Sequence, residues 1–210
     1  MRRTEALPSR LYAITDRRLC APQPLAEVVR ELLDAGVRFL QVREKDLRPE
    51  ELQTLADPIV RLCHDYDARA LINACPEAAT AVGADGVHLP GAAGPVEKIR
   101  AVSGRPWLVG CSTHDAEEVR KREAQGADFV VFGPVHPTDS KPGYGPAQGP
   151  AGLRRIVESV ELPVFALGGV SPDRVKACLD AGAFGVAVMS GLMRAGRRER
   201  VRAYLRELGE

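Results

Sequence analysis

The chain has 210 residues, of which 45% are hydrophobic and 27% are charged, the usual balance of a protein that folds around an apolar core. Its 29 basic and 28 acidic side chains give a formal net charge of +1, which argues against nucleic acid or an anionic membrane as the main partner. No run approaches about 18 consecutive apolar residues, and the N-terminus lacks the apolar segment of a signal peptide, so we expect a cytoplasmic protein without a membrane span.

One unit recurs along the chain: a helix-like segment ends at Ala-Gly or Gly-Ala, and a short β-rich run follows within a few residues. Glycine just after a helix is a common stop, because it takes a positive φ at little cost. Strands are expected near residues 11–15, 39–44, 69–74, 86–89, 107–112, 129–135, 163–169 and 185–190. The basic tail 194–208 carries apolar residues at helical spacing and predicts a closing amphipathic helix with a solvated basic face.

These strands are mostly apolar rather than alternating, which is typical of a parallel sheet covered by helices. Eight of them, alternating with helices and with no linker in between, predict an α/β fold: one (β/α)8 TIM barrel domain over residues 1–210. An open, doubly wound sheet is the alternative.

Polar residues or glycine stand at every predicted strand end, whereas the strand starts are mainly apolar, glycine or alanine. The strand-end residues are Thr15, Asp16, Arg43, Lys45, Asn73, His88, Ser112, Thr113, His136, Gly168, Gly169 and Ser190. In a (β/α)8 barrel the carboxyl ends of the strands carry the active site. The asymmetry therefore predicts a catalytic site at one end of the barrel.

Gln41, Arg43 and Lys45 lie two residues apart on the second predicted strand, so an extended chain points them the same way. Burying such groups costs several kcal/mol unless they meet polar partners or a ligand. We therefore expect them to face a ligand. A structural network that pairs the arginine with Glu44 or Asp46 is the alternative.

Two glycine turns follow the seventh and eighth predicted strands, at Gly168-Gly169 and at Ser190-Gly191. In this fold these two loops often hold a phosphate through backbone N–H groups, and glycine lets the backbone approach the ligand closely. The pair predicts a phosphate site, with simple tight turns as the alternative.

The segment "FGPVHPTDSKPGYGPAQG" (132–149) forms an unusually long polar loop after the sixth predicted strand. His136 can give and take a proton near neutral pH, so it is the candidate acid or base. Lys141, beside Thr138 and Ser140, suits a carboxylate or a phosphate. The glycine-rich remainder could cover a bound ligand.

Several motifs, in matching order over residues 11–193, resemble thiamine-phosphate synthases and the related thiazole tautomerases. They are "LYAITD", "FLQVREK", "LIN", "GADGVHL", "VGCSTH", "GADFVVFGPVHPTDSK", "PVFALGGVSPDR" and "GVAVMSGL". The resemblance implies a (β/α)8 barrel that acts on a thiazole phosphate in thiamine biosynthesis. It also implies substrate-binding roles for Gln41, Asn73, Ser112 and the T-x-S-K stretch at residues 138–141, and catalytic roles for Arg43 and Lys45.

The synthase branch joins a pyrimidine methyl diphosphate to the thiazole phosphate and holds Mg²⁺ with two aspartates. At the corresponding positions this chain has Ala74 and Ala93, which leaves a hard, oxygen-seeking cation without its carboxylates. The five scattered cysteines form no C-x-x-C pair and the histidines show no ligand spacing, so we predict no metal and no other cofactor, with Mg²⁺ required only in the synthase alternative.

The tautomerase branch moves a proton within the thiazole carboxylate phosphate and needs no metal. The missing aspartates and "HLP" at 88–90 favour this branch, with His136 in the acid–base role although Pro134 stands where that branch can carry its histidine. We therefore favour the tautomerase over the synthase. A non-catalytic ligand-binding barrel is a third hypothesis, and assembly into a homo-oligomer stays open.

Overall fold

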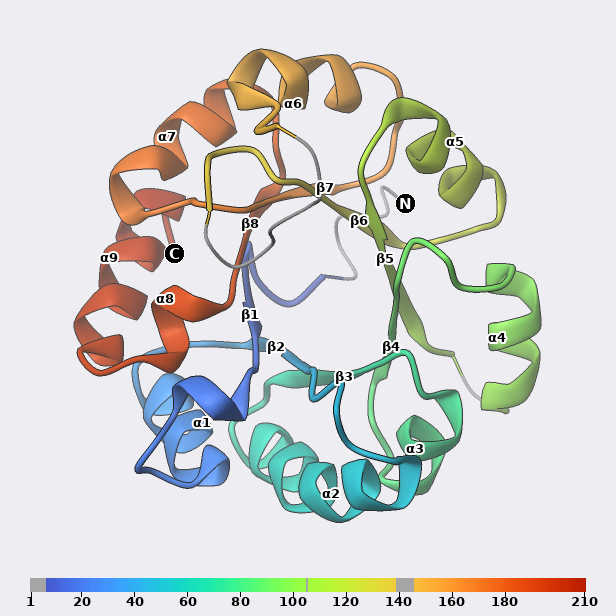
Figure 1. Ribbon diagram of the computed structural model, residues 1–210, viewed down its shortest axis with the longest axis vertical. Helices are drawn as coiled ribbons and strands as arrows, with labels where there is room; N and C mark the ends of the chain where they lie inside the picture. The colour runs from blue at the N-terminus through green and yellow to red at the C-terminus, as the bar shows by residue number, and fades with distance from the viewer. Residues whose placement is uncertain (1–6, 105, 139–145) are drawn as a thin grey trace.

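The computed structural model describes residues 7–104, 106–138 and 146–210, and its strands follow one another around a closed ring surrounded by helices (Figure 1). The strands are β1 Leu11–Ile14, β2 Phe39–Val42, β3 Arg69–Asn73, β4 Gly86–Leu89, β5 Leu108–Thr113, β6 Phe129–Phe132, β7 Val164–Leu167 and β8 Gly185–Val188. The helices are α1 Leu25–Asp34, α2 Pro49–Asp65, α3 Pro76–Ala81, α4 Val96–Ser103, α5 Ala116–Ala124, α6 Gly149–Val157, α7 Pro172–Asp180, α8 Ser190–Met193 and α9 Arg197–Leu208, with a 3-10 turn, η2, at Arg17–Leu19.

Neighbouring strands pair in parallel, and β8 closes the ring against β1, with Leu11 opposite Val186 and Ala13 opposite Val188. The predicted (β/α)8 barrel is therefore confirmed, and the open-sheet alternative is wrong. Each observed strand overlaps a predicted one. The agreement follows from strands that are buried on both faces and from glycines that stop the preceding helices, for example Gly36 at φ +114°.

Aromatic rings fill the interior of the barrel below the carboxyl ends of its strands. Tyr12, Phe39, Phe129 and Phe165 are fully buried, and the ring centroids of Tyr12 and Phe39 lie 4.3 Å apart. Phe129 meets Phe165 edge-on at 5.4 Å, a favourable geometry for aromatic pairs. A Cβ built on Gly110 would lie only 2.2 Å from Cζ of Phe129, so the glycine makes room for that ring. This layer is the floor beneath the strand ends.

Long-range hydrogen bonds from Arg197 and Tyr204 help to hold helix α9 in place. Arg197 is buried and donates hydrogen bonds of 2.8 Å to both Glu31 and Gln23. The hydroxyl of Tyr204 donates to the carbonyl oxygen of Val170 at 2.7 Å, near the end of β7. The amphipathic closing helix is confirmed, and these contacts bring its inner face, including Arg200, to the strand ends.

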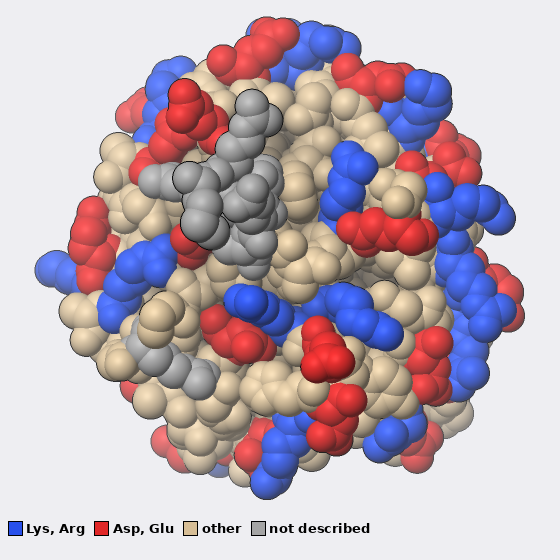
Figure 2. Space-filling view, turned by 180° about the vertical axis from the view of Figure 1, so that it is seen from behind, with Lys and Arg blue, Asp and Glu red and all other residues tan. Residues whose placement is uncertain are grey.

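Basic and acidic side chains are interspersed over the face opposite to that of Figure 1 (Figure 2). A mixed surface of this kind fits the near-zero net charge and does not offer nucleic acid a basic stripe there. Within residues 7–104, 106–138 and 146–210, no helix is both long and apolar enough to span a bilayer.

Candidate active site

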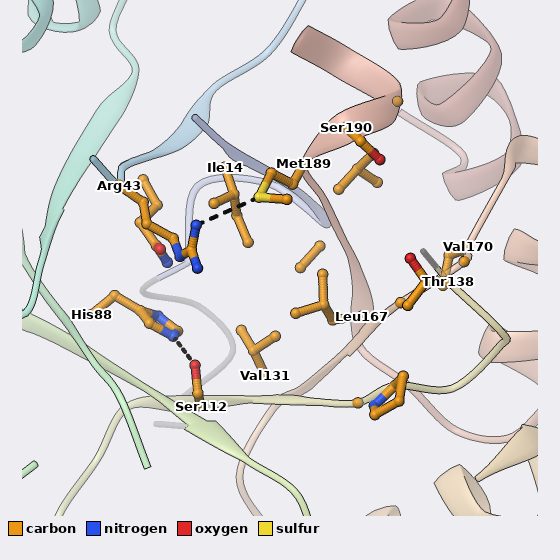
Figure 3. A pocket seen from close by; sticks show the side chains of 18 of the residues that line it. Ile14, Arg43, His88, Ser112, Val131, Thr138, Leu167, Val170, Met189 and Ser190 are labelled. Atoms are coloured by element: carbon orange, nitrogen blue, oxygen red, sulfur yellow. Dashed lines mark hydrogen bonds between the residues drawn. The ribbon is translucent and has the colours of Figure 1, made fainter. Parts of the chain in front are cut away.

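A cavity of about 420 Å³ opens at the carboxyl ends of the strands, where this fold places its active sites. Its polar and glycine lining includes Gln41, Arg43, Lys45, Asn73, His88, Ser112, His114, Thr138, Gly168, Gly169, Ser171, Arg174, Ser190, Gly191, Arg200 and Tyr204. Arg43 and His88 lie on one side of the cavity, and Ser190, Val170 and Thr138 lie on the other (Figure 3).

The structure brings most of the predicted site residues together in this cavity. The ten that line it are Gln41, Arg43, Lys45, Asn73, Ser112, Thr138, Gly168, Gly169, Ser190 and Gly191. Ser140 and Lys141 lie outside the described residues. Their predicted substrate-binding roles, and the functional roles of the ten lining residues, stay predictions.

The two glycine turns form one wall of the cavity. Gly168 and Gly169 have φ values of +96° and +59°, the left-handed region that side chains disfavour. A Cβ on Gly169 would lie 2.3 Å from the carbonyl oxygen of Pro137. Glycine is therefore required at this turn for packing, which fits both the predicted phosphate site and the alternative of a simple tight turn, so the phosphate site stays a prediction. Ser190 begins the short helix α8 beside it.

Two arginines that the sequence analysis did not identify flank this glycine wall. Arg174 of α7 donates from Nη1 to the carbonyl oxygen of Gly169 at 2.7 Å, and Arg200 of α9 donates from Nε to that of Gly191. Both side chains line the cavity. They add positive charge to the backbone donors, so this wall suits a phosphate dianion. Arg200 was assigned to a solvated basic face, and only the docking of α9 shows that it reaches the site.

The opposite side is built from the end of β2. Arg43 is half-buried, and its Nη1 lies 3.7 Å from Sδ of Met189 (Figure 3). The carboxylates that we considered as its structural partners are bonded to Arg17 instead: Glu44 at 3.1 Å, and Asp46 through two 2.8 Å bonds. Neither carboxylate is part of the described lining of the cavity.

A chain of buried hydrogen bonds lies above the aromatic floor and connects the strands beneath the two sides of the cavity. The amide of Gln41 donates to Oη of Tyr12 at 3.0 Å, Tyr12 lies 3.4 Å from Nδ1 of His88, and Nε2 of His88 lies 3.0 Å from Oγ of Ser112. Burial raises the pKa of Tyr12, so its hydroxyl keeps the proton. Gln41 thus serves this network, and Ser112, whose hydroxyl is bonded to His88, is part of the cavity lining (Figure 3).

Lys45 lies at the rim next to Arg43. Partial burial, and then the positive charge of Arg43, lower the pKa of its ammonium group from the usual 10.5. A lowered pKa means that Lys45 loses its charge at a lower pH than an ordinary lysine.

We therefore expect the affinity for pyrophosphate to fall on the alkaline side as Lys45 deprotonates, and Lys45→Arg to remove that fall. Isothermal titration calorimetry over a pH series measures both proteins with the same ligand, so the titration of pyrophosphate itself cancels. Lys176→Arg, an exposed lysine on α7, is the control. Parallel pH profiles for wild type and Lys45→Arg would contradict this role for Lys45.

His136 lies beside the cavity rather than in its described lining. Its backbone N–H donates to the carbonyl oxygen of Gly168 at 2.9 Å, and its Nε2 is buried without a hydrogen-bond partner among the described residues. Burial, and then the charge of Arg174, lower the pKa of the ring, so it is neutral at pH 7. Its predicted catalytic role stays a prediction.

The charged side chains in the described lining of the cavity are all basic: Arg43, Lys45, Arg174 and Arg200. Mg²⁺ prefers carboxylate oxygens, and this lining contains none. At about 6 Å and an effective dielectric of about 20, a divalent cation and one basic side chain repel each other by about 5 kcal/mol. The residues present therefore do not fit a magnesium site and fit anions instead.

The family model described as thiamine monophosphate synthase matches residues 11–192. A Geobacter sulfurreducens protein is 43% identical over 93% of this chain and 92% of its own, and its name assigns it provisionally as a thiamine-phosphate synthase. The thiamine-phosphate synthase of Methanospirillum hungatei is 38% identical over 87% of this chain and 89% of its own. The solved thiamine phosphate pyrophosphorylase of Pyrococcus furiosus superposes with a TM-score of 0.85 at 34% identity, covering 99% of this chain and 97% of that one. The chain thus belongs to the thiamine monophosphate synthase family, which confirms the resemblance seen in its motifs.

Proposed function

We propose that this enzyme of thiamine biosynthesis is a thiamine-phosphate synthase, which joins a pyrimidine methyl diphosphate to a thiazole phosphate. The observation that carries the proposal is a single cavity with positive charge on two sides, Arg174 and Arg200 at the glycine wall and Arg43 and Lys45 at the end of β2. Two anionic substrates need two such places. The names of the relatives support this synthase reading better than the tautomerase that the sequence alone favoured.

The reaction forms a bond between the thiazole nitrogen and the methylene carbon of the pyrimidine, and the bond from that carbon to the diphosphate breaks. The electron pair leaves with the diphosphate, so negative charge grows on its oxygens. Arg43 and Lys45, which line the cavity, would neutralise this charge. The turn Gly168-Gly169 and Ser190 would hold the thiazole phosphate, and the Ser112 hydroxyl would donate a hydrogen bond between the two groups.

The test is to incubate the purified protein with both substrates, and with each alone, in excess EDTA and again in excess Mg²⁺, and to separate the products by liquid chromatography. We expect thiamine phosphate and one equivalent of pyrophosphate only when both are present. A thiazole without its phosphate should react poorly, because it cannot make the proposed contacts with the two glycine turns. No thiamine phosphate from a folded protein, judged by circular dichroism, would reject the synthase.

A second candidate is the thiazole tautomerase, and the observation in its favour is the absence of carboxylates from the described cavity lining. A proton shift needs no metal, and Arg43 with Lys45 would then bind the thiazole carboxylate. In this candidate His136 is the predicted acid and base.

His136→Gln separates the two candidates. A tautomerase should lose about 10²–10⁴-fold in kcat with ligand affinity nearly unchanged, because positioned proton transfer is lost. A synthase should stay within a few-fold, because the ring does not line the described cavity. Steady-state kinetics on each substrate set measure this, with His64→Gln on the exposed side of α2 as the control. An unchanged tautomerase rate in His136→Gln would remove His136 from that mechanism.

A further inference from the structure

Among the described residues, the carboxylates around the end of β2 are already paired with arginines. Asp16 accepts hydrogen bonds of 2.9 and 3.0 Å from the guanidinium of Arg18. The pKa of this carboxyl is lowered mainly by Arg18 and, to a smaller extent, by the positive charge of Arg43. Glu44 and Asp46 are bonded to Arg17. Their oxygens already accept charge-assisted hydrogen bonds, so recruiting them to a metal would leave an arginine unpaired.

The backbone after β3 keeps a conformation that suits a different residue from the one present. Ala74 has φ +59°, in the left-handed region where asparagine, aspartate and glycine are enriched and where alanine is disfavoured. Its N–H donates to the carbonyl oxygen of His88 at 2.9 Å, and its side chain is exposed. The position therefore has both the backbone and the space for an acidic side chain, and it carries none.

The loop after β4 is held by a cation from the protein itself. Arg122 is buried, and its guanidinium donates to the carbonyl oxygens of Gly91, Ala93 and Gly94 at 2.8 to 3.0 Å. These bonds hold the loop without a metal, and the guanidinium of Arg122 places a further positive charge next to the backbone of Ala93.

We infer that the cavity binds the diphosphate of its pyrimidine substrate by direct contact with Arg43 and Lys45, without a bridging divalent cation. This inference rests on the proposed synthase function, because that reaction brings a diphosphate to the site. The two positive charges that a divalent cation would bring are supplied instead by Arg43 and Lys45, which neutralise the leaving group and remain in place through the reaction.

Binding of inorganic pyrophosphate to the wild-type protein tests this directly. Calorimetry should show binding in excess EDTA that is no weaker than binding in excess Mg²⁺, which itself complexes pyrophosphate in solution. Arg43→Gln should weaken binding in EDTA by about tenfold or more. Binding in EDTA that is more than about tenfold weaker than in Mg²⁺ would overturn the inference.

Restoring the carboxylates gives a second measurement. The variant Ala74→Asp/Ala93→Asp should bind pyrophosphate about tenfold more weakly in EDTA, because two negative charges approach the anion, and Mg²⁺ should recover the loss. The matched control is Ala74→Asn/Ala93→Asn, which keeps the backbone preference at residue 74 without the charge and should not respond to Mg²⁺. An aspartate variant that binds like wild type in EDTA would show that these positions do not face the anion and would count against the inference.

These outcomes separate the inference from the proposed function. A protein that makes thiamine phosphate only with Mg²⁺ would be a synthase that contradicts the inference. A protein that binds pyrophosphate equally well in EDTA but makes no thiamine phosphate would support metal-free anion binding and reject the synthase.

Discussion

Replacing Gly169 by alanine should lower the free energy of unfolding by about 2–5 kcal/mol and weaken phosphate binding by about 100-fold or more. The residue has φ +59°, and its built Cβ would lie 2.3 Å from the carbonyl oxygen of Pro137 and 2.9 Å from Cβ of His136. Neither neighbour is the end of a flexible side chain, so the loop after β6 has to move. The turn would move with it, away from a bound phosphate. Urea unfolding and calorimetry with the thiazole phosphate measure the two effects.

Gly83→Ala is the matched control, because Gly83 has a similar φ of +68° and no atom within 4 Å of its built Cβ. It carries the left-handed strain without the clash. We expect a loss of about 1 kcal/mol in stability and no change in phosphate binding. If Gly169→Ala kept its phosphate affinity, the glycine wall would not be the phosphate site.

Arg43→Gln should lower kcat by about 10²–10³-fold, the usual effect of removing one donor that stabilises developing charge. Arg43 is half-buried in the cavity wall, where a charge is less screened than at the surface, and the leaving diphosphate gains negative charge in the reaction. The thiazole phosphate binds on the other side, so its affinity should change little. Single-turnover kinetics with saturating substrates separate the chemical step from binding.

Arg120→Gln on the exposed side of α5 makes the same chemical change away from the cavity and should leave kcat within a few-fold. If Arg43→Gln only raised the KM of the diphosphate substrate and left kcat unchanged, Arg43 would contribute to substrate binding alone. If Arg43→Gln only weakened the affinity for the thiazole phosphate, that phosphate would lie beside Arg43, and the proposed arrangement of the two substrates would be reversed.

The barrel was predictable because its signals are local. Glycine after most of the helices, as at Gly36, Gly83, Gly126 and Gly182, and an apolar strand soon afterwards are properties of neighbouring residues. Eight strands of this kind leave little choice of architecture. Strand phase also predicted that Arg43 and Lys45 reach the cavity. It could not show that Gln41, on the same face, bonds to Tyr12 in the floor, because that partner lies on a different strand.

Arg174 and Arg200 show what sequence patterns miss. Each sits on a helix, several residues from the glycine turn that it flanks, and only the packing of α7 and α9 against the barrel brings it to the cavity. His136 is a case that the sequence leaves open. A histidine at a strand end is a natural candidate base, but the chain there continues alongside Leu167 and Gly168, and His136 is not part of the described cavity lining. Its catalytic role stays a prediction.

The two anion sites should be visible in a crystal structure of the protein with thiazole phosphate and pyrophosphate, grown in excess EDTA. We expect the phosphate within about 3 Å of Gly169 or Ser190 and the pyrophosphate against Arg43 and Lys45, with no metal between them. Pyrophosphate at the glycine wall, or pyrophosphate that appears only when Mg²⁺ is added and then coordinates it, would show that the cavity does not hold two metal-free anion sites.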